Sequence, residues 1–478
     1  MANTLELKQA ILQGDAERIA KQRAANKFTA RERVAKLLDA GSFVELDALV
    51  SRNNDYAGVV TGCGTVNDRP VYLFAQDFTV HGGAMGEQQA QKICKVLDLA
   101  MKTGAPVIAL CDSAGVRVDE GAAAMNAYAA IYARLAKLSG VCPVIAVVLG
   151  PCVGGAALIA QVADIAIEAE NVGMLSVYGP QVMGAAVGKT YDAKTVGGAA
   201  AMAKQGAVAL TAADEDAALA LAVQVLDILP SCNAEDADII DTDDMNRVLP
   251  ELAASDVDGL LANLADAGSA IELYPGYAQE IRVALARIGG RACGIVAANG
   301  ELVPAACAKA ARFIRLCDAY SLPVVSLINS KGVAVPALDA QAASMNGAAK
   351  LLFAYAEATT AKVTVITGDA IGQAYVAMGG KANADMTYAW PDAVISALTP
   401  DAAVQLLYAE ELRAGQSRAE LESKFATEVS GAINAAQAGA IDDIIEPAET
   451  RKYVINALEM LASKRESNPP KKHGNLPL

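Results

Sequence analysis

Short apolar runs alternate with longer segments of mixed apolar and polar residues along most of the chain. Residues 106–110 and 323–327 form largely apolar runs rich in β-branched side chains, which is typical of strands buried on both faces of a sheet. Segments of helical character, at 91–101 and 309–320, precede these two runs. Strands that alternate with helices at this spacing predict an α/β layered architecture.

The pattern occurs twice along the chain. Residues 38–46 have a close counterpart at 265–273, and the predicted helices repeat at Lys92 and Lys309, which lie 217 residues apart. An ordered set of matches at a nearly constant offset is the signature of an internal duplication. The sequence therefore predicts two tandem copies of one fold.

The length of 478 residues allows two ordinary domains. A stretch rich in acidic and turn-forming residues lies at 241–256 and includes Pro250. Because such stretches are common between compact units, we predict domains at residues 1–245 and 246–478.

Composition and charge exclude several classes of protein. Hydrophobic residues make up 54% and charged residues 19%, which is too apolar for a disordered chain. The net charge of −15 argues against nucleic acid as a partner, because such binding depends on neutralising phosphates. The start of the chain is polar, and the apolar stretch 141–160 is interrupted by proline and glycine. We therefore expect no signal peptide and no membrane span, and a cytoplasmic location.

Nine cysteines are scattered through apolar runs without a C-x-x-C pair. An odd count with irregular spacing indicates buried thiols in a reducing compartment. Only two histidines, His81 and His473, are present. Neither a bound metal nor a histidine-based mechanism is expected.

Glycine turns at predicted strand ends are the strongest chemical feature. The first half has two, at 112–115 and 150–155, and the second half has two, at 329–332 and 372–374. A turn without bulky side chains that opens a helix points backbone N–H groups outward, where they can hold an oxyanion. Each such donor contributes about 3 kcal/mol to stabilising a developing negative charge. Paired turns in both halves predict one oxyanion-binding pocket per half.

One simpler explanation of the glycine turns competes with this one. Glycines also permit tight packing of strand on helix, and for a single Gly-Gly pair that explanation is preferable. Recurrence of paired turns in both halves favours a binding role.

Asp112, Asp119 and Glu120 could act as general acids or bases, but loop solvation and helix capping explain them better.

Several motifs together resemble the biotin-dependent acyl-CoA carboxyltransferases, the family of propionyl-CoA carboxylase β and methylmalonyl-CoA decarboxylase α subunits. The amino-terminal signature K-F-T-A-R-E-R lies at 27–33, and D-S-A-G-V-R-V-D-E-G at 112–121 is similar to the family's D-S-G-G-A-R-x-x-E-G. The segment G-P-C-V-G-G-A at 150–156 matches closely, and the end K-K-H-G-N-L-P-L at 471–478 also fits. The resemblance covers nearly the whole chain.

The resemblance implies tandem crotonase-like domains that assemble as a homohexamer. It implies an acyl-CoA pocket between the first domain of one subunit and the second domain of its neighbour. The implied reaction moves a carboxyl group between an acyl-CoA and biotin on a separate carrier protein, with no tightly bound cofactor. The implied partners include either a membrane decarboxylase (Na⁺ pump) subunit, with which the protein would associate peripherally, or a biotin carboxylase.

The resemblance also assigns roles to residues. Gly154 and Gly155 would hold the ureido oxygen of biotin, and Gln373 and Ala374 would hold the thioester oxygen of the acyl-CoA. The apolar Val376 would suit a short acyl chain. The implied substrate-binding residues are Ser113, Ala114, Gly115, Val116, Arg117, Gly332 and Val376. Candidates for holding the phosphates of CoA are Arg117, Lys189 and Lys331.

The second half departs from the family pattern. The family's P-G-F-L-P-G aligns with residues 331–336, where only Gly332 is kept, and Asn329 stands at a family aspartate. Methylmalonyl- or malonyl-CoA decarboxylation is the preferred direction, partly because 384–386 resembles the decarboxylase branch. A propionyl- or acetyl-CoA carboxylase β subunit and a catalytically weakened scaffold that binds CoA esters remain alternatives. A hydratase or isomerase is disfavoured, because no glutamate adjoins Gly154 or Gln373.

Overall fold

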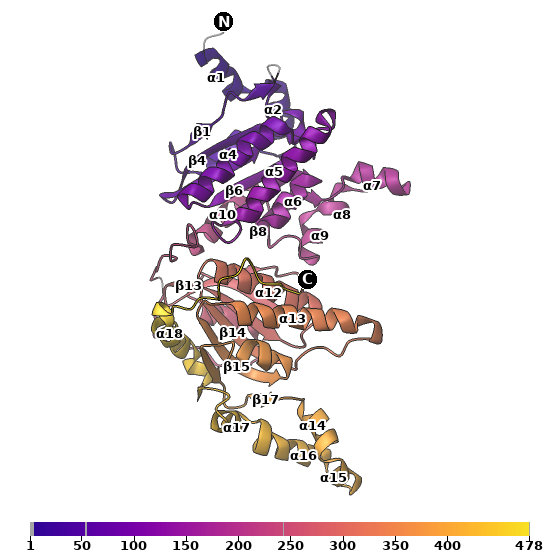
Figure 1. Cartoon of the computed structure of the whole chain (residues 1–478), viewed down its shortest axis with the longest axis vertical. Coiled ribbons are helices and arrows are strands. Elements are labelled where there is room, and N and C mark those ends of the chain that lie inside the picture. The colour runs from indigo at the N-terminus through magenta and orange to yellow at the C-terminus, as the bar shows by residue number, and fades with distance from the viewer. Residues whose placement is uncertain (1–3, 53–54, 242, 478) are drawn as a thin grey trace. The chain divides into compact units, whose positions relative to one another are not determined.

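The computed structural model describes residues 4–52, 55–241 and 243–477. The chain divides into two compact units, Met1–Asp236 (unit 1) and Ala237–Leu478 (unit 2), which Figure 1 colours from indigo to magenta and from rose to yellow. Each unit contains one large sheet with helices packed on it. The predicted α/β class, with a sheet in each half, is confirmed.

Unit 1 has a sheet in the order β1-β4-β5-β6-β7-β8-β10, with β9 paired to β7. Pairing is antiparallel from β1 to β5 and parallel from β5 onward. The strands are β1 (Val44–Leu46), β4 (Val59–Val66), β5 (Arg69–Gln76), β6 (Val107–Ser113), β7 (Val144–Val153), β8 (Ile165–Ala169), β9 (Met174–Ser176) and β10 (Leu210–Ala212). The short strands β2 (Ser51–Arg52) and β3 (Asp55–Tyr56) pair separately.

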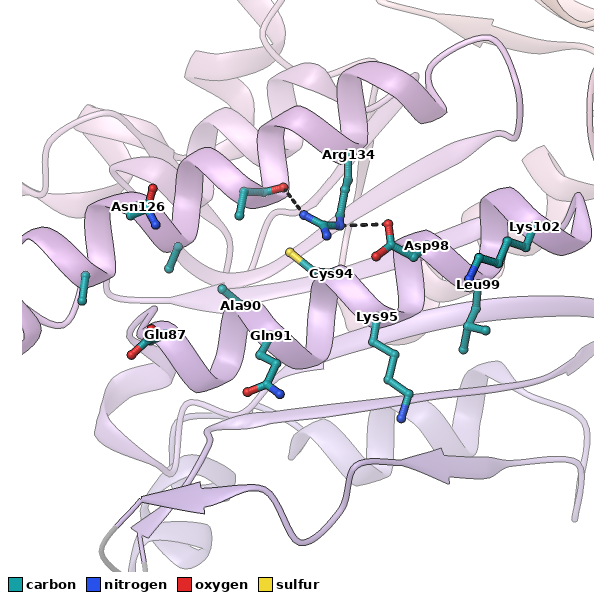
Figure 2. A pocket seen from close by; sticks show the side chains of 13 residues that line it. Glu87, Ala90, Gln91, Cys94, Lys95, Asp98, Leu99, Lys102, Asn126 and Arg134 are labelled. Carbon is teal, nitrogen blue, oxygen red and sulfur yellow. Dashed lines mark hydrogen bonds and ion pairs between the residues drawn. The ribbon is translucent and has the colours of Figure 1, made fainter.

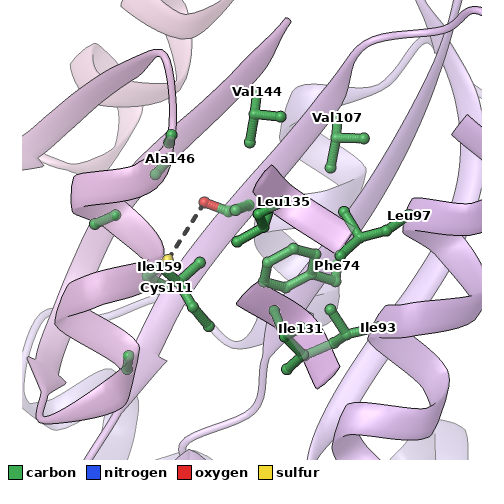
Figure 3. Packing of buried hydrophobic residues seen from close by; sticks show 14 of the residues in the cluster. Phe74, Ile93, Leu97, Val107, Cys111, Ile131, Leu135, Val144, Ala146 and Ile159 are labelled. Carbon is green, nitrogen blue, oxygen red and sulfur yellow. Dashed lines mark hydrogen bonds between the residues drawn. The ribbon is translucent and has the colours of Figure 1, made fainter. Parts of the chain in front are cut away.

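Two long helices connect the parallel strands of unit 1 and cover one face of the sheet. Phe74 of β5 belongs to the same buried cluster as Ile93 and Leu97 of α4 and Ile131 and Leu135 of α5 (Figure 3). The helices of unit 1 are α1 (Thr4–Gln13), α2 (Ala16–Ala24), α3 (Ala30–Leu37), α4 (Glu87–Thr103), α5 (Ala122–Leu138), α6 (Gly155–Val162), α7 (Pro180–Val187), α8 (Ala193–Gly197), α9 (Ala199–Lys204) and α10 (Glu215–Ile228).

The opposite face of this sheet meets α3 and α10. Successive side chains of a strand point to opposite faces, so Ala109 and Cys111 of β6 join the α4–α5 cluster. Asp112 points to the other face, where it contacts Arg33 of α3. The carboxyl end of β6 is therefore where the two helical layers and the sheet meet.

Unit 2 repeats this topology strand for strand. Its sheet has the order β11-β12-β13-β14-β15-β16-β18, with β17 paired to β15. The strands are β11 (Ile271–Leu273), β12 (Ile281–Ile288), β13 (Arg291–Asn299), β14 (Val324–Ser330), β15 (Lys362–Ile371), β16 (Met386–Ala389), β17 (Val394–Ser396) and β18 (Asp443–Ile444). The helices are α11 (Val257–Leu264), α12 (Pro304–Ala319), α13 (Gln341–Glu357), α14 (Pro400–Leu407), α15 (Ala409–Arg413), α16 (Arg418–Phe425), α17 (Ala432–Gln437) and α18 (Thr450–Met460), with a π-helical turn at Tyr375–Gly379.

All nine cysteines are free thiols, and all except the half-buried Cys63 are buried. Within the part of the chain that the structure describes, no helix is both long enough and apolar enough to cross a membrane.

Candidate functional site

The candidate site of each unit begins with a shift of register between two parallel strands. In unit 1, Cys111 pairs with Val148 and Ser113 pairs with Cys152, so Asp112 alone faces the stretch 149–151. Unit 2 has the same shift between β14 and β15, where Asn329 alone faces 367–369. The extra residues form a bulge on β7 and on β15. Both bulges lie at the carboxyl ends of the strands, next to the predicted glycine turns.

The turn after each bulge ends at the start of a helix. Gly154 has a φ of 65° and donates its N–H to the Ser176 carbonyl at 3.0 Å, and Gly372 has a φ of 52° and donates to the Ser396 carbonyl at 2.8 Å. The N–H of Gly154 therefore already has an acceptor. Gly155 begins α6, and the first N–H groups of a helix have no acceptor within it. Gly155 is thus the stronger candidate donor of the predicted pair.

In unit 2 the helical turn begins at Gln373, directly after Gly372. The backbone N–H groups of Gln373 and Ala374 lie in its first turn, where they too lack an acceptor within the helix. The side chain of Gln373 is exposed and that of Ala374 is buried. The backbone of both residues can therefore present donors whatever the side chain of residue 373.

A second strand-like segment runs beside each turn. Met85 donates its N–H to the Gly115 carbonyl at 2.7 Å, and Arg117 donates to the Met85 carbonyl at 2.8 Å. Since backbone groups alternate in direction along an extended segment, the N–H of Val116 points away from Met85. A Cβ added at Gly115 would lie 3.5 Å from the Val153 carbonyl, which places this segment beside the end of β7.

Unit 2 repeats this segment. Leu302 donates its N–H to the Gly332 carbonyl at 2.8 Å, and Ala334 donates to the Leu302 carbonyl at 3.1 Å. The N–H of Val333 therefore points away from Leu302, and Gly332 approaches the Ile371 carbonyl so closely that a Cβ there would lie 2.8 Å from it. Val333 is a candidate donor that sequence reasoning missed. The evidence for it is an isolated bridge between residues 302 and 333, which no sequence pattern marks.

Two tyrosines of α5 fix the turns of unit 1. A Cβ on Gly155 would lie 2.7 Å from ring carbons of Tyr128, whose hydroxyl donates to the Gly115 carbonyl at 3.1 Å. The Tyr132 hydroxyl donates to the Gly155 carbonyl at 2.7 Å. Burial raises the pKa of the Tyr132 hydroxyl to about 12 and that of Tyr128 further, so both remain protonated donors at neutral pH. Tyr128 thereby links the two backbone segments of the candidate site.

The acidic residues considered as acids or bases have structural partners. Asp112 is fully buried and accepts from Lys27 and Arg33. Asp119 pairs with Arg117 at 3.1 Å. Glu120 accepts the backbone N–H of Glu87 at 2.7 Å, at the start of α4. The interpretation as loop partner and helix cap therefore holds for Asp119 and Glu120. It does not hold for Asp112, which is a buried strand residue paired with Lys27 and Arg33.

The remaining predicted residues lie on the same two segments of their own unit. Ser113 is buried, and its hydroxyl accepts the Gly115 N–H at 3.2 Å, while Ala114 is exposed. In unit 2, Val376 follows the helix start and is 44% exposed. Of the suggested phosphate-binding residues, Lys189 and Lys331 are exposed, whereas Arg117 is held by Asp119 and Glu120. Unit 1 thus brings 113–117 together with 154–155, and unit 2 brings Gly332 together with 373–376.

A groove of about 600 Å³ lies between α4 and α5 of unit 1 (Figure 2). Arg134 donates to the Asp98 carboxylate across it at 2.9 Å, and Cys94 lies between the two helices. None of the predicted site residues lines this groove. This groove therefore lies apart from the residues predicted for the site.

The chain is thus a duplicated α/β protein, and each unit has a candidate site of backbone N–H donors at the carboxyl ends of its strands. Residues 21–476 match the family model of the carboxyl transferase domain. The chain belongs to this family, the carboxyltransferases of biotin-dependent carboxylases and decarboxylases, and it is an enzyme of acyl-CoA carboxyl transfer.

Its relatives include subunits of both decarboxylases and carboxylases. The chain is 40% identical to the methylmalonyl-CoA decarboxylase subunit alpha of Veillonella parvula, over 97% of this chain and 96% of that one. It is also 40% identical to the putative propionyl-CoA carboxylase beta chain of Bacillus subtilis, over 98% of both chains. A solved structure of the transcarboxylase 12S hexamer, with methylmalonyl-coenzyme A bound, superposes with a TM-score of 0.94 at 35% identity and covers 100% of both chains.

Proposed function

We propose that this chain is the carboxyltransferase subunit of a decarboxylase complex, built from two crotonase-like domains. It moves a carboxyl group between a short acyl-CoA of the methylmalonyl or malonyl type and biotin on a separate carrier protein. The observation that carries this proposal is the repeated pair of backbone N–H groups that are not used by their own helix start or bridge, Gly155 with Val116 in unit 1 and Gln373 with Val333 in unit 2. Carboxyl transfer to or from an α-carbon develops negative charge on two oxygens, and one such pair can serve each of them.

Unit 1 is assigned to biotin. Biotin, when bound, supplies the nitrogen that carries the carboxyl group. The ureido oxygen fits the donors of unit 1, because Gly155 is only half-buried and carries no side chain that would block its N–H. Tyr128 and Tyr132 hold the two turns in place from beneath, so the donors need little reorganisation when charge develops.

Unit 2 is assigned to the acyl-CoA. The N–H groups of Gln373 and Ala374, with that of Val333, would stabilise the thioester oxygen as it gains enolate character. Loss of one such donor typically costs 10²–10³-fold in rate. The exposed Val376 is apolar and suits a short acyl group. Gly332 and residues 113–117 are assigned to substrate contacts, and the exposed Lys189 and Lys331 to the phosphates of CoA.

Family membership also supports a proposal for the oligomeric state and the partner proteins. The transcarboxylase 12S core is a hexamer, and we propose a homohexamer here, with a biotin carrier protein as a partner. The relation to methylmalonyl-CoA decarboxylase α subunits supports a membrane decarboxylase subunit as a further partner and a cytoplasmic protein at the membrane surface. A biotin carboxylase is the corresponding partner if the enzyme runs as a propionyl- or acetyl-CoA carboxylase.

The test is a transfer assay with the purified full-length protein. Methylmalonyl-CoA or malonyl-CoA is incubated with free biotin, and biotin-dependent loss of the acyl-CoA carboxyl group is expected.

A second candidate function, a scaffold that binds CoA esters without turnover, is favoured by the segment 331–346, in which Val335 and Leu338 are more than nine-tenths exposed. Calorimetric binding of acyl-CoA without any biotin-dependent transfer would establish that scaffold instead.

A further inference from the structure

The bulge beneath the turn of unit 1 is filled by four charged side chains. Arg33 donates to the Asp112 carboxylate at 2.8 Å, to the Glu215 carboxylate at 2.6 Å and to the Leu149 carbonyl at 2.6 Å. Lys27 donates to Asp112 at 2.7 Å. The side chains of Asp112 and Arg33 are fully buried, and those of Glu215 and Lys27 are 2% and 10% exposed. Two cations and two anions leave the cluster neutral as a whole.

This cluster occupies the space that the bulge creates. A Cβ on Gly150 would overlap the Asp112 carboxylate and lie 2.5 Å from the Lys27 ammonium. Arg33 contacts both strands whose ends form the site, since Asp112 belongs to β6 and Leu149 to β7. The charged cluster therefore joins the ends of the two strands that lead to Val116 and to Gly155.

Unit 2 has the same bulge, but uncharged residues stand at the positions that match Lys27, Arg33 and Asp112. The helix α11 repeats α3 at an offset of 227 residues, so Ala254 stands for Lys27 and Leu260 for Arg33. Asn329 stands for Asp112, and a Cβ on Gly368 would overlap its amide oxygen and lie 3.3 Å from the Ala254 methyl group.

The contacts of Asn329 are those of an uncharged amide. Its side chain donates to the Asn299 side chain at 2.9 Å and accepts the Asp369 N–H at 3.1 Å. Leu260 is buried at 2% exposure. The duplicated position is thus ionic in unit 1 and uncharged in unit 2, on the same backbone.

We propose that Arg33 and Lys27, with Asp112 and Glu215, are positioning residues. They hold the donor pair of unit 1 and set the affinity of unit 1 for its ligand, while the affinity of unit 2 does not depend on them. A bidentate guanidinium fixes its partners in direction as well as distance, whereas an amide pair constrains the unit 2 bulge less. The inference rests on the proposed function, because it assigns biotin to unit 1 and acyl-CoA to unit 2.

The unit 2 sequence supplies the test variant. Lys27→Ala, Arg33→Leu and Asp112→Asn copy unit 2, and Glu215→Gln removes the charge that would otherwise be left unpaired. Replacing a complete buried ionic cluster with neutral residues is often compatible with folding, whereas removing one partner is strongly destabilising. Arg33→Lys is the conservative companion, since an ammonium cannot keep the forked geometry.

The first measurement is the KM of free biotin and of the acyl-CoA in the transfer assay. The neutral variant is expected to raise the biotin KM about tenfold to a hundredfold, because small misplacement of binding groups is costly. The acyl-CoA KM is expected to rise by a clearly smaller factor, because of the residues that contact this substrate only 113–117 lie beside the cluster. Arg33→Lys is expected to fall between wild type and the neutral variant. Asn329→Ala is the matched control in unit 2 and should raise the acyl-CoA KM instead.

The second measurement needs no activity. Hydrogen exchange of residues 113–117 and 149–155 is expected to be at least about tenfold faster in the neutral variant, with residues 329–333 and 367–374 unchanged. Unchanged exchange in unit 1, or KM values that move equally for both substrates, would overturn the positioning role. A wild-type protein that transfers no carboxyl group would refute the proposed function separately, and the exchange result would still decide the positioning role.

Discussion

Glu168 is the most informative residue for a test of stability. It lies on β8 and is fully buried, and burial outweighs the backbone N–H of Leu175, which favours the charged form of its carboxyl group. Burial raises the pKa of this carboxyl group from 4.5 to about 8, because a charged form in this environment loses its hydration. Glu168→Gln removes the ionisable group and keeps the shape of the side chain.

The sign of the effect follows from the direction of the shift. The folded pKa is raised, so the folded state keeps its proton while the unfolded chain has lost it. Wild type therefore loses stability as pH rises from 4.5 to about 8, at about 1.4 kcal/mol per pH unit. Relative to wild type, Glu168→Gln is expected to be more stable by about 2 kcal/mol at pH 6 and by up to about 5 kcal/mol at pH 8.

The assay is urea unfolding followed by circular dichroism at several pH values between 5 and 9, always as a difference from wild type. Differencing matters because burial also lowers the pKa of Lys92 and of Lys309 to about 8, and these groups titrate in both proteins. Glu170→Gln is the matched control, since Glu170 is exposed at the end of the same strand. A constant difference between Glu168→Gln and wild type across this pH range would refute the reasoning.

Three further predictions concern the candidate site and the core of unit 2. Gln373→Pro removes one backbone donor at a position where proline suits a helix start and should lower transfer about 10²-fold or more, whereas Gln373→Ala keeps the N–H and should retain activity within a few-fold in the same assay. Tyr128→Phe removes one donor from the Gly115 carbonyl, which still accepts from Met85 and Ser113, and should cost about 1 kcal/mol in urea unfolding, with a fall in transfer rate; unchanged values for both would contradict the linking role. Arg451→Met leaves the buried Asp266 without its 2.7 Å cation partner and should destabilise unit 2 by about 3–5 kcal/mol in thermal or urea unfolding.

The fold was predictable because its signals are local. Continuous β-branched runs such as 106–110 and 323–327 can be recognised one segment at a time, and their repetition predicts the duplication. The glycine turns were predictable for the same reason, since Gly154 and Gly372 both adopt a positive φ that favours glycine. Motif resemblance then supplied the activity.

The parts of the site that could not be predicted from the sequence depend on contacts between residues far apart in the chain. The N–H of Gly154 is occupied by Ser176, and that of Val333 is directed by Leu302, and neither fact is encoded near the turn. The charged cluster joins Lys27 to Asp112 and Arg33 to Glu215 across 85 and 182 residues. Only the folded chain shows that such charges are buried together and neutralise one another.

The comparison of the two units explains why the second half could change so much in sequence and keep its architecture. An oxyanion site made of backbone N–H groups depends on the course of the chain and only weakly on which side chain each residue carries. Gln373 can therefore replace a glycine, because the donor belongs to the peptide group. What must be kept is whatever holds the course of the chain, and here the units differ, with an ionic cluster beneath one turn and the Asn329 amide beneath the other. Substitutions beneath the turns should accordingly affect transfer more than substitutions of exposed side chains on them.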